Sequence, residues 1–202
     1  MKAFFDIDTQ IDFVFPAGAL YAPGAERILP AVSRLNRYAA ANGIALFSTM
    51  CAHGEDTAEF RVWPPHCVAG TAGQQKPAPT LLGKRVTVPN RPLALTEVLG
   101  EQNLVEQNPV EQILVEKDAL DLFTNPNMEP LLHRFDVEEC FVYGVLTEYC
   151  VRCAVMGLLA RGAKVSLIFD ATAHLSAAEA DRVLHEFISA GGKVISAAQC
   201  LV

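Results

Sequence analysis

The chain has 202 residues, of which 51% are hydrophobic, and a formal net charge of −7. A chain of this length and composition can bury a large core, so we expect one α/β domain over residues 1–202. The acidic balance and the lack of a Lys/Arg stripe argue against a nucleic acid or an anionic membrane as a partner. The acidic Asp6 near the start of the chain does not fit the apolar segment of a secretory signal peptide. No run reaches the roughly 18 apolar residues of a spanning helix. We therefore expect a cytoplasmic protein.

Short apolar runs alternate with segments of helical periodicity along most of the chain. The runs predict strands at residues 3–7, 44–49, 84–89, 112–116, 139–145, 164–169 and 193–197. The helical segments lie at residues 24–41, 127–135, 148–160 and 177–190. Apolar strands that are followed by helices predict a parallel sheet with helices on both faces. Residues 50–83 form a long, weakly periodic segment, and loops of that length in compact domains are commonly functional.

Three reactive side chains stand at the ends of predicted strands. Asp8 follows the first strand, Lys117 follows residues 112–116, and Cys150 follows residues 139–145. In a parallel sheet the carboxyl ends of the strands meet at one edge, where ligands bind. A carboxylate can accept a thiol proton, and an ammonium group can stabilise both the thiolate and the carboxylate. The combination predicts a nucleophilic cysteine site.

Cys150 belongs to the stretch GVLTEYCVRC at residues 144–153. We expect Thr147 to be the N-cap of a helix, which would place Cys150 in the first helical turn, where the helix dipole favours a thiolate. The alternative is a buried core thiol. In a reducing compartment all six cysteines stay thiols, and we assign Cys140, Cys153 and Cys200 to the core.

Five motifs, spread in order over nearly the whole chain, carry a resemblance. They are DTQIDF at residues 8–13, WPPHCVAGT at 63–71, Lys117, GVLTEYCV at 144–151 and DATA at 170–173. With these motifs the chain resembles the isochorismatase-like cysteine hydrolases, and among them the nicotinamidase branch. The resemblance implies a Rossmann-like three-layer α/β/α sandwich around a six-stranded parallel sheet, a cis peptide between Val145 and Leu146, and homo-oligomers.

The same resemblance implies roles for the motif residues. Asp8, Lys117 and Cys150 would form the catalytic triad. The backbone N–H groups of Leu146 and Cys150 would form the oxyanion hole. Phe13 and Trp63 would wall the substrate pocket, although ordinary core packing also explains both rings. Gln10 and Asp12 read as structural residues that tie the first loop to neighbouring backbone.

Nicotinamidases bind a divalent metal beside the nucleophile, and the corresponding positions here are altered. They are Cys51, His53, Glu59 and His66, where Cys51 replaces an aspartate and Glu59 a histidine. All four residue types can bind zinc, so a divalent metal such as zinc could be held here, and no organic cofactor is implied. The alternative is that His53 and His66 only bond to loop carbonyls and that no metal binds.

The function that follows is a cysteine amidohydrolase that splits a small carboxamide into acid and ammonia. Nicotinamide is the leading substrate, and other small amides or ureido compounds follow. Isochorismatase-type hydrolysis of a vinyl ether is one alternative, although it does not need a cysteine nucleophile. A catalytically silent ligand-binding member of the fold is the other.

Overall fold

The computed structural model describes residues 1–100 and 110–201. Within these ranges seven parallel strands form one sheet in the order β3-β4-β2-β1-β5-β6-β7. The strands are β1 (Lys2–Ile7), β2 (Ala45–Cys51), β3 (Arg85–Val88), β4 (Gln112–Lys117), β5 (Glu139–Val145), β6 (Lys164–Ala173) and β7 (Lys193–Ile195). The expected parallel α/β architecture is confirmed.

The six-stranded sheet implied by the resemblance is wrong by one strand. All seven apolar runs of the sequence form strands, including the short β7. This strand pairs with residues 166–168 of β6, whose backbone N–H and C=O groups would otherwise form an unpaired edge.

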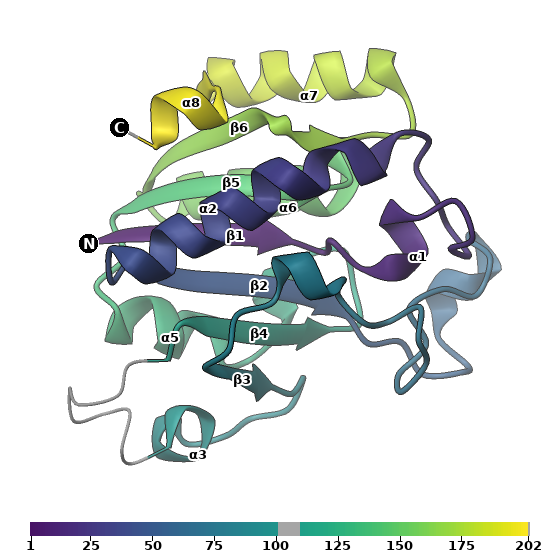
Figure 1. Cartoon of the computed structure of the whole chain (residues 1–202), viewed down its shortest axis with the longest axis horizontal. Helices are drawn as coiled ribbons and strands as arrows, with labels where there is room; N and C mark the ends of the chain where they lie inside the picture. The colour runs from purple at the N-terminus through teal and green to yellow at the C-terminus, as the bar shows by residue number, and fades with distance from the viewer. Residues whose placement is uncertain (101–109, 202) are drawn as a thin grey trace.

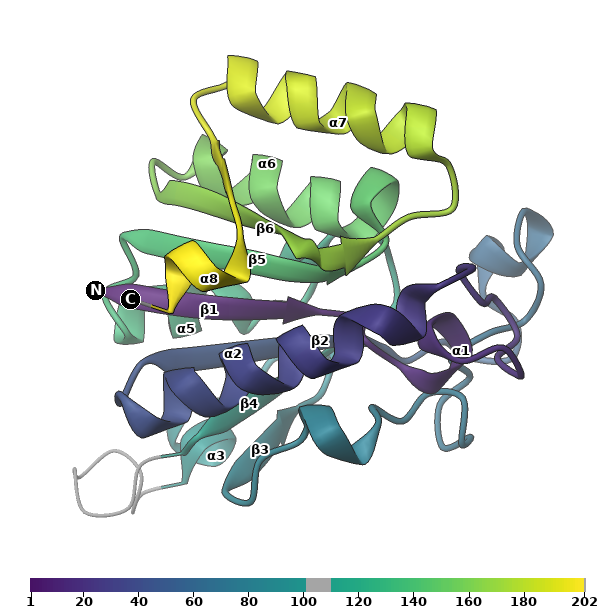
Figure 2. The same cartoon turned by 45° about the horizontal axis from the view of Figure 1, so that its top comes forward.

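The helices lie on both faces of the sheet (Figures 1 and 2). They are α1 (Ile11–Val14), α2 (Leu29–Ala41), α3 (Leu95–Leu99), α5 (Met128–Arg134), α6 (Arg152–Ala160), α7 (Ala177–Ser189) and α8 (Ala197–Cys200). A π-helical turn, Thr147–Val151, precedes α6. The sequence pattern did not predict α1, α3 and α8, because four or five residues are too few to show a helical period. No helix in the described ranges has the length and apolar character of a membrane span.

The sheet separates two hydrophobic cores. On one face Phe4 packs in the cluster that includes Val32 and Leu35 of α2. On the other face Phe5 and Phe47 stack with ring centroids 5.2 Å apart, in the cluster that contains α5 and α6 residues. Successive strand residues point to opposite faces, so adjacent phenylalanines in β1 serve both cores. Each such ring contributes about 2–3 kcal/mol by burial, which holds the strand ends in place.

The strand order makes β1 the point from which the chain winds in opposite directions. β2 pairs with one side of β1 and β5 with the other. A parallel sheet of this kind has its ligand crevice beyond the carboxyl ends of the strands at such a point. The segment between β2 and β3 runs over this end of the sheet in Figure 1 and is pinned by a β-bridge between His53 and Val68.

Candidate active site

Asp8 and Lys117 form a fully buried ion pair at the carboxyl end of the sheet. The Lys117 Nζ atom lies 2.8 Å from Asp8 Oδ2, and it also donates to the backbone oxygen of Ala119 at 2.9 Å. The other carboxylate oxygen of Asp8 accepts a 2.7 Å hydrogen bond from the Thr49 hydroxyl. The strand ends β1, β2 and β4 therefore meet at one charged centre.

Each partner keeps the other charged. Burial alone would raise the pKa of the Asp8 carboxyl, but the charge and hydrogen bond of Lys117 hold that pKa below its usual value. Burial would lower the pKa of Lys117, but the negative charge of Asp8, first among its neighbours, raises that pKa well above its ordinary value. The resting pair is thus a carboxylate and an ammonium group.

Cys150 brings its sulfur to the same centre. Its Sγ atom accepts from Lys117 Nζ at 3.5 Å, and the side chain is only 6% exposed. The sequence predicted that these three strand-end residues would meet, and the structure brings them together. The peptide between Val145 and Leu146 is cis, as the resemblance implies.

The predicted N-cap role of Thr147 is wrong. The Thr147 hydroxyl donates to the carbonyl oxygen of Ala173 at 3.0 Å, and the N-cap position is taken by Leu146 in an extended conformation. The turn that follows is π-helical, so Cys150 is the fourth residue of this turn rather than the third. The hydroxyl is used to join β5 to β6 because the strand end of β6 lies directly beside it.

Glycine is required where β5 passes β1. Gly144 has φ of +117°, and a Cβ atom there would collide with the backbone of Ile7. The close approach sets the path of β5 toward Cys150. Leu146 and Cys150 both line the pocket described below. That their backbone N–H groups form the oxyanion hole remains a prediction.

Cys51, which the sequence placed in the metal group, is a second thiol in the centre. Its Sγ atom lies 3.2 Å from Lys117 Nζ and 3.8 Å from Asp8 Oδ2. Asp8 oxygen and the sulfurs of Cys51 and Cys150 lie within 4.8 Å of one another. The missing signal was the length of β2: the strand extends to Cys51, and its pairing register places Cys51 directly beside Lys117 of β4.

The two thiols titrate as a pair. A hydrogen bond with Cys150 lowers the pKa of Cys51 to about 6, and the same bond raises the pKa of Cys150 well above its ordinary value. One negative charge is stabilised by the Lys117 ammonium group, and a second charge so close would be repelled. The pair therefore loses one proton easily and the other with difficulty.

Gln10 fixes the backbone of Cys51 from both sides. Its Oε1 atom accepts from the Cys51 N–H at 2.7 Å, and its Nε2 atom donates to the Cys51 carbonyl at 2.8 Å. Asp12 accepts from the N–H of Cys67 at 2.7 Å and from that of Ala19 at 2.9 Å. The structural roles predicted for Gln10 and Asp12 are confirmed.

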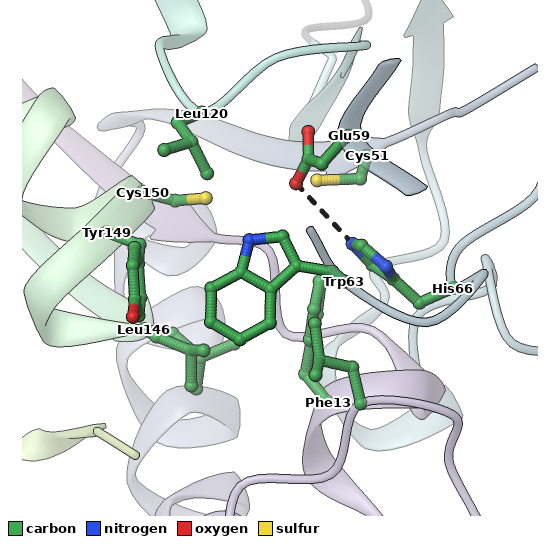
Figure 3. A pocket seen from close by; sticks show the side chains of 11 residues that line it. Phe13, Cys51, Glu59, Trp63, His66, Leu120, Leu146, Tyr149 and Cys150 are labelled. Carbon is green, nitrogen blue, oxygen red and sulfur yellow. Dashed lines mark ion pairs between the residues drawn. The ribbon is translucent and has the colours of Figure 1, made fainter. Parts of the chain in front are cut away.

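A pocket lies above the two sulfurs, with about 350 Å³ of space between its lining atoms when the part open to solvent is included (Figure 3). Both predicted aromatic residues line it: Phe13 is nearly buried, and Trp63 is half-exposed. The Trp63 ring meets Tyr149 edge-on, with centroids 5.3 Å apart. The lining residues are Phe13, Leu20, Cys51, Glu59, Trp63, His66, Leu120, Val145, Leu146, Tyr149 and Cys150. A small, flat and largely apolar ligand suits such walls.

His53, Glu59 and His66 form a second polar group at the side of this pocket. Their ligand atoms lie within 4.8 Å of one another. Glu59 is 3.8 Å from His53 Nε2 and 3.7 Å from His66 Nε2. Of the four predicted metal ligands the structure brings these three together, whereas Cys51 lies with Asp8 and Cys150.

The hydrogen bonding of this group fits a zinc site. His53 is fully buried next to Cys51, yet among the described residues neither of its ring nitrogens has a hydrogen bond of ordinary geometry. Such orphaned nitrogens are costly unless an ion binds them. His66 donates from Nδ1 to the carbonyl of Pro64 at 2.8 Å, which leaves Nε2 as the free lone pair on the side of Glu59. Two imidazoles and one carboxylate are the donor set of many catalytic zinc sites.

Comparisons with known proteins agree with this geometry. The chain is 22% identical over 212 residues to the nicotinamidase of Saccharomyces cerevisiae, with 87% of this chain and 89% of that protein covered. It is 26% identical, with a TM-score of 0.77, to a pyrazinamidase of Pyrococcus horikoshii solved with zinc, covering 96% and 98% of the two chains. N-carbamoylsarcosine amidase from Thermoplasma acidophilum shares the fold, with a TM-score of 0.74 at 19% identity over 97% and 96% of the chains.

A family model settles the assignment. The model of the isochorismatase domain matches residues 96–199, which is more than half of the chain. That segment holds two of the three strand-end residues, Lys117 and Cys150, and the π-helical turn that contains Cys150. The chain belongs to the isochorismatase family of hydrolases, and its likeness lies near the nicotinamidase branch.

Proposed function

We propose that the protein is a cysteine amidohydrolase that converts a small carboxamide, nicotinamide or a similar compound, into a carboxylic acid and ammonia. One observation carries the proposal: the Lys117 ammonium group touches both the Asp8 carboxylate and the Cys150 sulfur beneath an aromatic-walled pocket. A carboxylate, a cation and a thiol at one buried point are the groups needed to make and use a thiolate.

In the first half of the reaction Cys150 attacks the amide. Asp8 accepts the thiol proton, and the sulfur bonds to the carbonyl carbon. The oxygen takes up the negative charge against the N–H groups of Leu146 and Cys150, each worth roughly 3–4 kcal/mol by analogy with measured oxyanion holes. Asp8 then passes its proton to the nitrogen, the C–N bond breaks, and ammonia leaves a thioester on Cys150.

In the second half water cleaves the thioester. Asp8, again a carboxylate, removes a proton from the water molecule as its oxygen attacks the carbonyl carbon. The C–S bond breaks, the Cys150 sulfur takes the proton from Asp8, and the acid leaves. The low pKa of Asp8 beside Lys117 supports this role, because the group is in its basic form at neutral pH.

The pocket limits the substrate by size and polarity. The free space between its apolar and aromatic walls is small, so a single ring or a short ureido compound suits it better than a peptide. A zinc ion held by His53, Glu59 and His66 would supply a positive charge that binds a ring nitrogen or another lone pair of the substrate. The aromatic rings of Phe13 and Trp63 would orient the plane of the amide.

The test is release of ammonia from a panel of small amides and ureido compounds. We expect turnover by the wild-type protein, with and without added zinc or manganese, and a loss of at least about a thousandfold in Cys150→Ala. Cys153→Ser, one helical turn away, is the matched control and should keep the activity. Equal turnover by the wild type and Cys150→Ala would overturn the thiol mechanism. Vinyl-ether hydrolysis, or tight binding of an amide without turnover, would favour the two alternatives.

A further inference from the structure

We propose that Cys51 and Cys150 are an oxidative modification site, at which a hydroperoxide links the two thiols as a reversible disulfide. The bond itself depends only on the two sulfurs and their neighbours. Its effect on activity rests on the proposed function, because the disulfide would occupy the nucleophile. Neither the catalytic triad nor the metal group needs a thiol at position 51.

The geometry that carries this inference is the shared contact with Lys117. Its Nζ atom lies 3.2 Å from Cys51 Sγ and 3.5 Å from Cys150 Sγ, and the two sulfurs are within 4.8 Å of each other. One ammonium group therefore faces both sulfurs, so the negative charge that develops on either sulfur during a reaction lies beside a cation. Rotation of the side chains must close the gap to the roughly 2.05 Å of a disulfide bond.

The backbone holds both residues in this relation. Cys51 ends β2 and is clamped by the paired hydrogen bonds of Gln10 described above. Cys150 sits in the π-helical turn after β5. By contrast, the Cys67 thiol donates to the carbonyl oxygen of Gly73 at 4.0 Å and has no hydrogen bond with Lys117.

The pocket gives a small oxidant access to the pair. Both sulfurs line the same opening, although the side chains are only 2% and 6% exposed. Hydrogen peroxide, the smallest hydroperoxide, is only one heavy atom larger than the water molecule that must also reach Cys150 during hydrolysis. A bound amide or acid in the pocket would exclude it, so ligand should protect the thiols.

The reaction balances in two steps. Asp8 takes the proton of Cys150, whose sulfur attacks one peroxide oxygen; the O–O bond breaks, and the products are a sulfenic acid and hydroxide or alkoxide, which takes the proton from Asp8. The Cys51 sulfur then attacks the Cys150 sulfur, the S–O bond breaks, and the departing hydroxide takes the Cys51 thiol proton and leaves as water. Together two thiols and one hydroperoxide give one disulfide, one alcohol or water, and one further water. A dithiol reductant reverses the change.

The experiment treats the purified protein with hydrogen peroxide, blocks the remaining thiols with N-ethylmaleimide and maps the linked peptides by mass spectrometry. We expect a loss of two hydrogens and a peptide pair joined through Cys51 and Cys150. Cys51→Ser should lack that pair, and Cys153→Ser should keep it. Circular dichroism of each variant verifies that it is folded. Thiols that all remain free in excess peroxide, or a link from Cys150 to Cys153, would overturn the proposal.

Activity provides a second and separable measure. Each protein is compared with its own untreated sample. Dithiothreitol should restore the wild type after brief peroxide treatment, whereas Cys51→Ser should recover at least about tenfold less of its starting activity, because an unprotected sulfenic acid oxidises further. Equal recovery by the two proteins would argue against Cys51 as the resolving thiol. If no amide is turned over, the proposed function fails while the peptide map still decides the disulfide.

Discussion

Replacement of Lys117 by methionine tests the buried charge centre most sharply. The Lys117 and Asp8 charges are 2.8 Å apart and fully buried. At an effective dielectric constant of about 20 their attraction is about 6 kcal/mol, part of which is offset by the loss of water around both groups. Removal of one partner leaves the other charge buried and unpaired, so we expect Lys117→Met to lose about 3–5 kcal/mol of unfolding free energy at pH 8.

The loss should depend on pH in a specific direction. In the wild type the pKa of Asp8 is lowered, so its contribution to stability is present above the unfolded pKa near 4 and is lost as the pH falls through the folded pKa. The raised pKa of Lys117 gives a contribution that is lost only as the pH rises above its ordinary value of 10.5. In Lys117→Met, burial raises the pKa of Asp8 instead, so the variant should lose stability as the pH rises from 5 to 8.

The double variant Asp8→Asn/Lys117→Met is the matched control. It has neither charge, so it should regain about 2 kcal/mol or more of the stability that the single variant loses at pH 8, and the gap between the two should narrow at pH 5. Urea unfolding followed by circular dichroism at both pH values measures these differences. Identical stability of the single and double variants at pH 5 and 8 would refute the assignment of a buried ion pair.

Three other changes probe the strand crossing, the pocket wall and the metal group. Gly144→Ala should lower the free energy of unfolding in urea by about 2–4 kcal/mol, because the new Cβ atom meets the Ile7 backbone. The control Gly162→Ala, which has a positive φ but open space, should lower it by about 1 kcal/mol. Equal losses in the two variants would contradict the close approach of β5 to β1. Trp63→Ala should raise KM for aromatic amides about tenfold while changing kcat less, and an unchanged KM in steady-state ammonia assays would remove Trp63 from the substrate wall. His53→Ala should weaken zinc binding by about 10–100-fold in calorimetric titration. The surface control His185→Ala should bind zinc as the wild type does. Wild-type zinc affinity in His53→Ala would exclude the metal group.

Much of the fold follows from local patterns in the sequence. Each apolar run became a strand, and the residues that follow three of those runs, Asp8, Lys117 and Cys150, meet at one edge because parallel strands share their direction. Ser176 accepts from the Glu179 N–H as a helix N-cap, as the pattern predicted. These features depend on nearby residues, so periodicity and capping signals predict them.

Other features depend on register and on contacts distant in sequence. Cys51 enters the site because β2 pairs with β4 two residues beyond its predicted end, and an apolar run does not reveal its register. The Thr147 hydroxyl turns away from its helix because the Ala173 carbonyl of β6 lies beside it. Among the thiols assigned to the core, Cys140 is fully buried, but Cys153 and Cys200 are only half-buried.

The central proposal, that Cys150 is the nucleophile of an amide hydrolase, is tested most directly by locating the acyl group during turnover. The protein would be mixed with the best amide of the panel, quenched in acid, digested and mapped by mass spectrometry. We expect the mass of the acyl group on the peptide that contains Cys150 and on that residue alone. An acyl group on Cys51, or on any other residue, would contradict the mechanism.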